Sequence, residues 1–196
     1  MKMAANILVA SALAATATAS VQFILTAPPP VRIPVVEFKE EPKTSWKCPD
    51  CSPNEQYVLE QLQQQTKITD RNALATIMGN IKQESLFIPN ICEGGDRIPY
   101  RDCHSGGYGI IQWTSVNRYD NLGRFCQKYG CDPSTLEGQT RYMINENIFQ
   151  RVLPEFEGGG QTISQYMVPA YYWLGWGIEG KREVYAYEYT KKLINV

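Results

Sequence analysis

The clearest periodic pattern along the chain lies between residues 70 and 85. Its apolar positions recur at spacings of three and four and share one helical face: Leu74, Ile77, Met78 and Ile81. Thr69 or Asp70 is a suitable N-cap for this helix, and Pro89 limits it on the far side. The pattern predicts an amphipathic helix that packs one face into a core.

Weaker patterns predict further helices. Ser52 and Glu55 form a capping-box signal before a short amphipathic stretch that ends near residue 65. Pro133 is placed to begin a helix that includes Ile148. The other expected helices run from Val116 to Tyr129, from Ile163 to Trp173 and from Glu183 to Ile194. Residues 92–109 are rich in glycine, proline and serine and predict a long loop or small β region, so we expect a mainly α (α+β) fold.

Glu84 extends the apolar stripe of the first helix, because it lies three residues after Ile81. Partial burial and the negative end of the helix dipole would both favour its neutral form. A neutral carboxylic acid near neutral pH is what a glycosidase uses to protonate a leaving glycosidic oxygen. A solvated Glu84, or one paired with Lys82, is the simpler alternative.

Two motifs around this acid resemble a known superfamily. The stretches "KQESLFIPN" and "GYGIIQW" are similar to the Glu-Ser-x-Phe and Gly-(Leu/Ile)-x-Gln motifs of lysozymes and lytic transglycosylases. With "RYDNLGRF" and "GQTRYMINE", residues 54–195 resemble the phage tail lysozyme family of virion-associated peptidoglycan hydrolases. The sequence departs from the usual motif at Leu86, where glycine is common, and in the cysteine pair between the two motifs.

The resemblance implies a lysozyme-like fold and roles for six residues. Glu84 would be the catalytic acid that cleaves the β-1,4 bond between N-acetylmuramic acid and N-acetylglucosamine, and Ser85 would hold it. The substrate groove would be lined by four residues of the second motif: Tyr108 and Trp113 as apolar platforms, Gly109 where the backbone approaches the glycan, and Gln112. No metal or organic cofactor is implied.

A second carboxylate is needed in both classical glycosidase mechanisms. Asp96 and Asp102 in the intervening loop are the nearest candidates, although each also fits a loop cap or an ion pair. Glu146 is a third candidate, which we favour as a structural ion pair. Without a second carboxylate, a group of the substrate itself would act, as in lytic transglycosylases.

The six cysteines form three local pairs, which predicts disulfides made outside the reducing cytosol. Neighbour pairing would join Cys48 to Cys51, Cys92 to Cys103 and Cys126 to Cys131. Two alternatives stay open: a zinc site built on the C-x2-C spacing of the first pair with the third pair or His104, and a redox-active Cys48–Cys51 bond.

The chain begins with an apolar segment, residues 1–27, followed by a proline-rich linker, residues 28–47, and the catalytic domain, residues 48–196. Lys2, the apolar run and the small residues near Ala19 fit a cleaved secretory signal. Apolar character resumes after that site, so residues 3–27 also fit a retained helix that contacts a membrane or other virion proteins.

Composition excludes several function classes. The 19 basic and 20 acidic residues give a net charge of −1 with no basic run, which argues against nucleic-acid binding. The single histidine, His104, lies beside Cys103 and makes Cys–His or Ser–His hydrolase chemistry improbable.

We therefore expect a virion protein, in the tail or an internal ejection apparatus, that acts on peptidoglycan in the host periplasm during genome delivery. Two other functions fit the sequence. One is an inactive lysozyme-like fold that serves assembly or glycan binding, because fold alone does not give activity. The other is an endolysin with a signal anchor.

Overall fold

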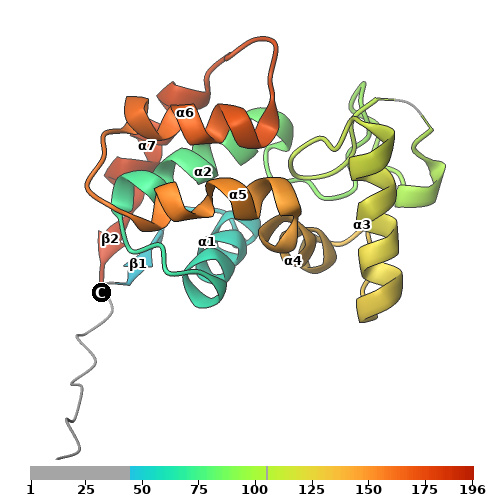
Figure 1. The fold of residues 1–196 in the computed structure, drawn as a ribbon, viewed down its shortest axis with the longest axis horizontal. Coiled ribbons are helices and arrows are strands. Elements are labelled where there is room, and N and C mark those ends of the chain that lie inside the picture. Colours follow the sequence, from blue (N-terminus) through green and yellow to red (C-terminus); the bar gives the residue numbers. More distant parts are fainter. Residues whose placement is uncertain (1–44, 105) are drawn as a thin grey trace, which may run out of the picture. The chain divides into compact units, whose positions relative to one another are not determined.

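The computed structural model describes residues 45–104 and 106–196, and the predictions for residues 1–27 and for most of the linker lie outside this part. The described residues form seven α-helices, one 3-10 turn and one two-stranded antiparallel sheet (Figure 1). The elements are β1 (Trp46–Lys47), α1 (Pro53–Gln65), α2 (Arg71–Ser85), η1 (Tyr100–Asp102), α3 (Val116–Tyr129), α4 (Leu136–Asn145), α5 (Asn147–Glu157), α6 (Ile163–Leu174), α7 (Arg182–Lys192) and β2 (Ile194–Asn195). The predicted mainly α fold is confirmed.

Three of the expected helix starts are confirmed by their caps. Ser52 and Glu55 form the complete capping box of α1. The Asp70 carboxylate accepts hydrogen bonds from the backbone N–H groups of Asn72 and Ala73 at the start of α2, at 2.8 and 3.0 Å. Ser115 caps α3 in the same way. Each cap satisfies N–H groups that the first helical turn leaves without a partner.

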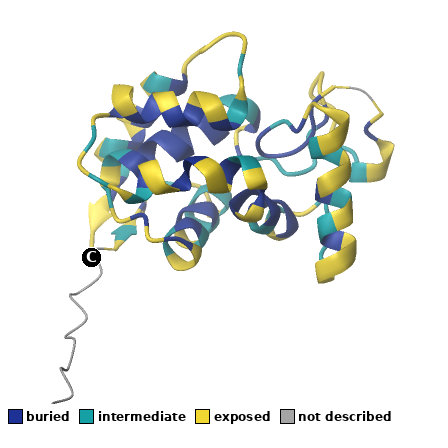
Figure 2. Ribbon diagram, in the orientation of Figure 1, coloured by how far each residue is buried: buried dark blue, intermediate teal, exposed yellow. Residues whose placement is uncertain are grey.

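Helix α2 is the centre of the domain, with α1, α5, α6 and α7 packed around it. Every residue from 73 to 81 is buried, so the helix is covered on all sides rather than on one face (Figure 2). The helix is therefore more buried than its amphipathic pattern predicts, because small and polar residues such as Ala75 and Asn80 also lie in the core.

Helix α7 packs closely on α2 across Gly79. A Cβ atom at this position would lie 2.5 Å from the backbone nitrogen of Ala186 and 2.8 Å from the carbonyl oxygen of Arg182. The missing side chain lets the two helices approach at backbone distance. This contact fixes the start of α7 beside the last turns of α2.

Four predicted boundaries are wrong. The helix expected to begin at Pro133 begins at Leu136, with Thr135 as its N-cap. The helix expected to reach Ile194 ends at Lys192, because Leu193 is extended. The helix expected to run through Ile148 is divided into α4 and α5 at Glu146, whose backbone is extended. Trp46 and Lys47 were assigned to the linker, but they pair with Asn195 and Ile194 in the sheet.

Residues 91–104 and 106–109 form the expected small lobe of loops. It contains two isolated β-bridges, Ile91 with Arg97 and Cys92 with Tyr108, and the turn η1. The Cys92–Cys103 disulfide closes it, and the other two predicted disulfides, Cys48–Cys51 and Cys126–Cys131, are also present. Since Cys48 and Cys51 are bonded to each other, their thiolates do not provide the zinc site considered above.

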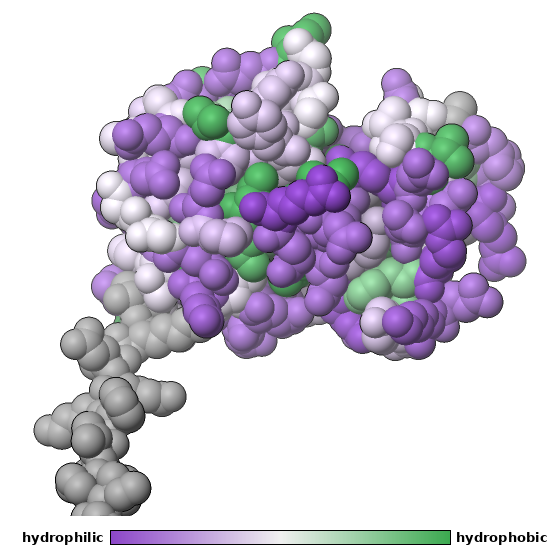
Figure 3. Space-filling model, in the orientation of Figure 1, coloured by the Kyte–Doolittle hydropathy of each residue, from purple (hydrophilic) through white to green (hydrophobic). Residues whose placement is uncertain are grey.

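The surface of the described part is mostly polar on the face seen in Figure 3, including the region over α3. A notch indents this face between the loop that follows α6 and the loop lobe. Within residues 45–104 and 106–196, no helix combines the length and apolarity that a membrane span requires.

Candidate functional site

Glu84 occupies the last turn of α2, next to an unusual backbone turn. Leu86 and Phe87, which follow that helix, have φ of 52° and 61°, values that non-glycine residues seldom adopt. A glycine, common at the position of Leu86 in the related motif, would take this conformation without strain. Gln112, with φ of 51°, is the third such residue among those described, and all three lie close to Glu84 in sequence or in space. Strained backbone of this kind clusters at functional sites.

Ser85 fastens this turn to the second motif. Its hydroxyl donates to the carbonyl oxygen of Ile110 at 2.8 Å and accepts from the backbone N–H of Phe87 at 3.1 Å. Ser85 is buried, and its hydrogen bonds go to the backbone rather than to Glu84. The prediction that Ser85 holds the acid or binds substrate is therefore wrong; it joins the two motifs.

A pocket of about 640 Å³ opens beside Glu84. It lies between the end of α2, the segment after the second motif, the first turn of α3 and the loop between α6 and α7. Its lining residues are Glu84, Ile111, Gln112, Thr114, Ser115, Arg118, Leu174, Gly175, Trp176, Gly177, Ile178 and Arg182.

Arg182 forms an ion pair with Glu84 across the wall of this pocket. Only 6% of the arginine side chain and 16% of the glutamate side chain are exposed. The arginine donates its other terminal nitrogen to the carbonyl oxygens of Ile178 and Glu179, at 2.9 and 2.7 Å, and stacks on Trp176 with 4.7 Å to the ring centre. It therefore orients the acid and the pocket loop together.

Arg182 is not among the residues that the sequence predicts for this site. Glu84 and Arg182 lie 98 positions apart, and no local pattern links them. Gly79 is the sequence feature that indicates a close contact between helices, but it does not identify the partner helix.

The two predicted aromatic platforms are wrong, because both rings lie in the core. Tyr108 and Trp113 are each 0% exposed. Tyr108 donates its hydroxyl to the carbonyl oxygen of Ile98 at 3.0 Å, and Trp113 packs against Tyr142 with ring centres 5.4 Å apart. The half-buried Trp176 is the aromatic side chain that lines the Glu84 pocket instead.

Gly109 is required for a different reason from the one predicted. It is buried with φ of 75°, and a Cβ atom there would lie 2.4 Å from the side-chain oxygen of Gln139. That amide accepts from the backbone N–H of Ile110 and donates to the carbonyl oxygens of Pro89 and Pro133. The glycine thus makes room for a buried glutamine that ties the second motif to neighbouring loops.

Gln112 lines the Glu84 pocket, and its contact with a substrate stays a prediction. Its side-chain nitrogen donates to the carbonyl oxygen of Gly109 at 3.0 Å, which stabilises the turn of the second motif. The backbone carbonyl of Gln112 accepts from the Thr114 hydroxyl at 2.8 Å. The side chain is half-buried, so it retains a surface toward the pocket.

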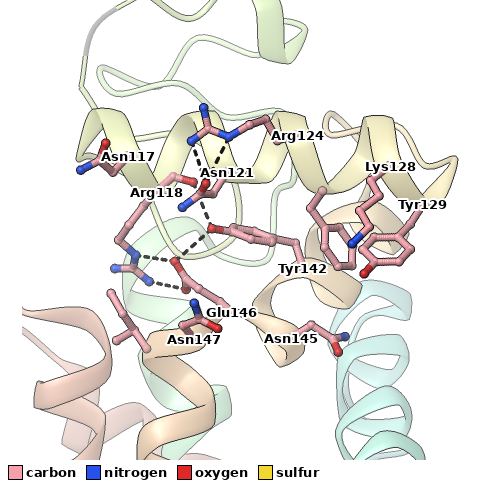
Figure 4. A pocket seen from close by; sticks show the side chains of 12 residues that line it. Asn117, Arg118, Asn121, Arg124, Lys128, Tyr129, Tyr142, Asn145, Glu146 and Asn147 are labelled. Atoms are coloured by element: carbon pink, nitrogen blue, oxygen red, sulfur yellow. Dashed lines mark hydrogen bonds and ion pairs between the residues drawn. The ribbon is translucent and has the colours of Figure 1, made fainter.

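The candidate second acids are not in the pocket. Asp96 and Asp102 are exposed in the loop lobe, and neither lines the space beside Glu84. Glu146 is 5% exposed and forms a two-point ion pair with Arg118, with both N–O distances 2.6 Å (Figure 4). This geometry is that of the structural ion pair we favoured for Glu146.

One comparison with known proteins identifies a family. The model of the phage tail lysozyme family matches residues 53–162. No curated protein matches the chain. The matched range includes Glu84 and the second motif and stops before α6, so the opposite wall of the pocket, with Trp176 and Arg182, lies outside it. Because more than half of the sequence is matched, the chain belongs to the phage tail lysozyme family.

Proposed function

We propose that this protein is a peptidoglycan glycosidase that cleaves the bond between N-acetylmuramic acid and N-acetylglucosamine, with Glu84 as its general acid. Membership of the family implies peptidoglycan-lytic activity in a phage context. The choice of residue and of bond is our own inference. It rests mainly on one observation: Glu84 is the one carboxylate among the described residues that line the pocket.

Several features of the pocket support this role. Glu84 is mostly shielded from water and held by Arg182, so its position is defined before a substrate binds. Trp176 offers an apolar surface for a sugar ring, and Gln112, Thr114 and Ser115 offer amide and hydroxyl groups for its polar edge. A mixture of aromatic and hydrogen-bonding groups around one acid suits an uncharged glycan.

In the proposed reaction, the protonated Glu84 donates its proton to the glycosidic oxygen as the bond to the muramic acid C1 breaks. In this proposal, the acetamido group of the muramic acid stabilises the positive charge at C1. Water then gives a reducing end, or the sugar's own 6-hydroxyl gives a 1,6-anhydro end, and the proton of the attacking hydroxyl returns to Glu84.

Mass spectrometry of the products separates these two outcomes. Anhydro ends would exclude simple hydrolysis, and reducing ends would exclude the transglycosylase reaction. Both outcomes are compatible with Glu84 as the acid, so this measurement refines the proposal without testing it.

The test of the proposal is the Glu84→Gln variant on purified sacculi. An amide of nearly equal size cannot supply the proton, so we expect the rate of glycan cleavage to fall about 10²- to 10⁴-fold. Binding of the variant to sacculi should remain, as measured by co-sedimentation.

Glu155→Gln is the matched control, since Glu155 is an exposed acid on α5 far along the chain from the pocket residues. It should cleave sacculi like the wild type. A Glu84→Gln protein that is folded and fully active would overturn the assignment.

A second function, an inactive lysozyme-like fold used for assembly or glycan binding, makes the opposite prediction. Wild-type protein would then bind sacculi and release no fragments. We also propose that the protein is a virion component that opens the cell wall during genome delivery, with residues 3–27 contacting membrane or virion proteins. Detecting it in purified particles, rather than only in lysing cells, would support that placement over an endolysin.

A further inference from the structure

A second pocket, of about 520 Å³, shares a wall with the Glu84 pocket. It lies between one face of α3 and the junction of α4 and α5 (Figure 4). Arg118 lines both pockets, so the two spaces are neighbours that share this side chain. The site proposed above uses only the first pocket.

The second pocket carries excess positive charge. Three cationic side chains line it, and Glu146 is the single carboxylate, already paired with Arg118. Arg124 donates to the side-chain oxygen of Asn121 at 2.7 Å, and the Lys128 ammonium lies 4.9 Å from the centre of the Tyr129 ring. Neither Arg124 nor Lys128 forms an ion pair within the described part of the chain. Two exposed positive charges therefore remain for a ligand.

The rest of the lining is rich in carboxamides. Four asparagines surround the pocket, at positions 117, 121, 145 and 147. The side chains of Asn117 and Asn147 make no hydrogen bond to other described residues, so their donors and acceptors are open to a ligand. Carboxamides pair with peptide groups, whereas the cations pair with carboxylates.

The floor of the pocket is held in place by the Arg118–Glu146 pair. The Tyr142 hydroxyl donates to Glu146 at 3.4 Å, and burial together with the Glu146 charge raises the pKa of Tyr142, so the phenol stays a donor. The pair is buried and its charges cancel. Only Arg124 and Lys128 face a ligand as uncompensated charges.

We propose that this pocket binds the carboxylate-bearing peptide attached to muramic acid while the glycan occupies the Glu84 pocket. The assignment of this ligand rests on the proposed function, because only a peptidoglycan substrate carries a glycan and an anionic peptide on one sugar. A strand without peptides keeps only the lactyl carboxylate of each muramic acid and lacks the amide groups and further carboxylates of the peptide. The enzyme would therefore prefer strands that still carry their peptides.

Binding of a soluble muramoyl peptide, which contains no cleavable glycosidic bond, tests the site directly. We expect the full chain to bind it and the Arg124→Gln/Lys128→Gln variant to bind about fivefold more weakly, as expected for two exposed charge contacts. The wild-type affinity should fall as salt rises, since the contacts are screened. The control Arg151→Gln/Lys191→Gln removes two exposed cations elsewhere and should bind like the wild type.

Cleavage rates on two substrates complete the test. One substrate is phosphate-free sacculi whose peptides are intact. The other is glycan strands from which an amidase has removed the peptides. The wild type should cleave intact strands faster, and the Arg124→Gln/Lys128→Gln variant should lose most of this preference. Equal wild-type rates on both substrates, failure to bind the peptide, or equal effects of the two double variants would overturn the proposal. Absence of cleavage on both substrates, with peptide binding intact, would instead reject the proposed function.

Discussion

At the scale of single residues, the site depends on side chains that the sequence motifs do not contain. Glu84 was identified by its place on a helical stripe and by its motif, and it does lie at a pocket. Arg182 was not identified, because an ion pair across 98 positions leaves no local pattern. The predictions for Tyr108 and Trp113 are wrong because an aromatic residue in a glycine-led motif fits a core as well as a binding surface.

Replacing Arg182 tests its role as a positioning residue. We expect Arg182→Gln to lower kcat for glycan cleavage by about tenfold, since the acid loses the partner that orients it. Arg182→Lys should recover part of the loss, because a cation remains at the wall. The measurement is a kinetic comparison on sacculi, with protein stability recorded separately by thermal unfolding.

A double variant shows whether the arginine acts through the glutamate. If it does, Glu84→Gln combined with Arg182→Gln should be no slower than Glu84→Gln alone. If the rate losses of the two single variants multiply in the double variant, Arg182 contributes independently of the acid, for instance by binding the sugar.

At the scale of elements, periodicity and capping residues predicted most helices, because both signals act within one turn of the chain. The division between α4 and α5 was missed for a tertiary reason. Glu146 is drawn into an ion pair with Arg118 of α3, and its extended backbone interrupts the apolar pattern. Nothing in the neighbouring sequence marks that break.

The contact between α2 and α7 can be tested at Gly79. An added methyl group in Gly79→Ala would meet backbone atoms of α7, which have no rotamer by which to move aside. We expect the free energy of unfolding to fall by about 1–3 kcal/mol, as for overpacking in other cores. Chemical denaturation measures this change.

The kcat of the folded Gly79→Ala protein should also fall, because α7 carries Arg182. Gly130→Ala is a useful comparison: Gly130 has φ of 67° but open space around its Cβ position. It should cost about 1 kcal/mol through backbone strain alone and leave the kcat of the folded protein unchanged. Equal activity of Gly79→Ala and wild type would show that the Arg182 position tolerates movement of α7.

At the scale of the whole molecule, the family match and the folded unit cover different ranges of residues. The match covers residues 53–162, whereas the sheet and the ion pair at the pocket require residues up to 195. The three disulfides were predicted from local spacing, and short loops leave few other partners within reach. The sheet between β1 and β2 was not predicted, because two-residue strands carry no periodicity.

Truncation tests whether the folding unit ends with the family match or extends to the end of the sheet. Residues 45–196, produced in an oxidising compartment, should unfold in one cooperative transition. Residues 45–162 lack α6 and α7, which cover two sides of α2, and should remain unfolded or aggregate because that apolar surface is exposed. Circular dichroism during heating distinguishes the two results, and a cooperative transition in the shorter chain would contradict this description.

The pairing of β1 with β2 also bears on protein engineering. The backbone N–H of Val196 donates to the carbonyl oxygen of Ser45 at 3.0 Å, so a brief linker can close these two positions into a ring. New ends can then be opened in the glycine turn at residues 158–160, on no wall of the Glu84 pocket. Such a circular permutant would place α6 and α7 ahead of α1 and still bring Arg182 to Glu84.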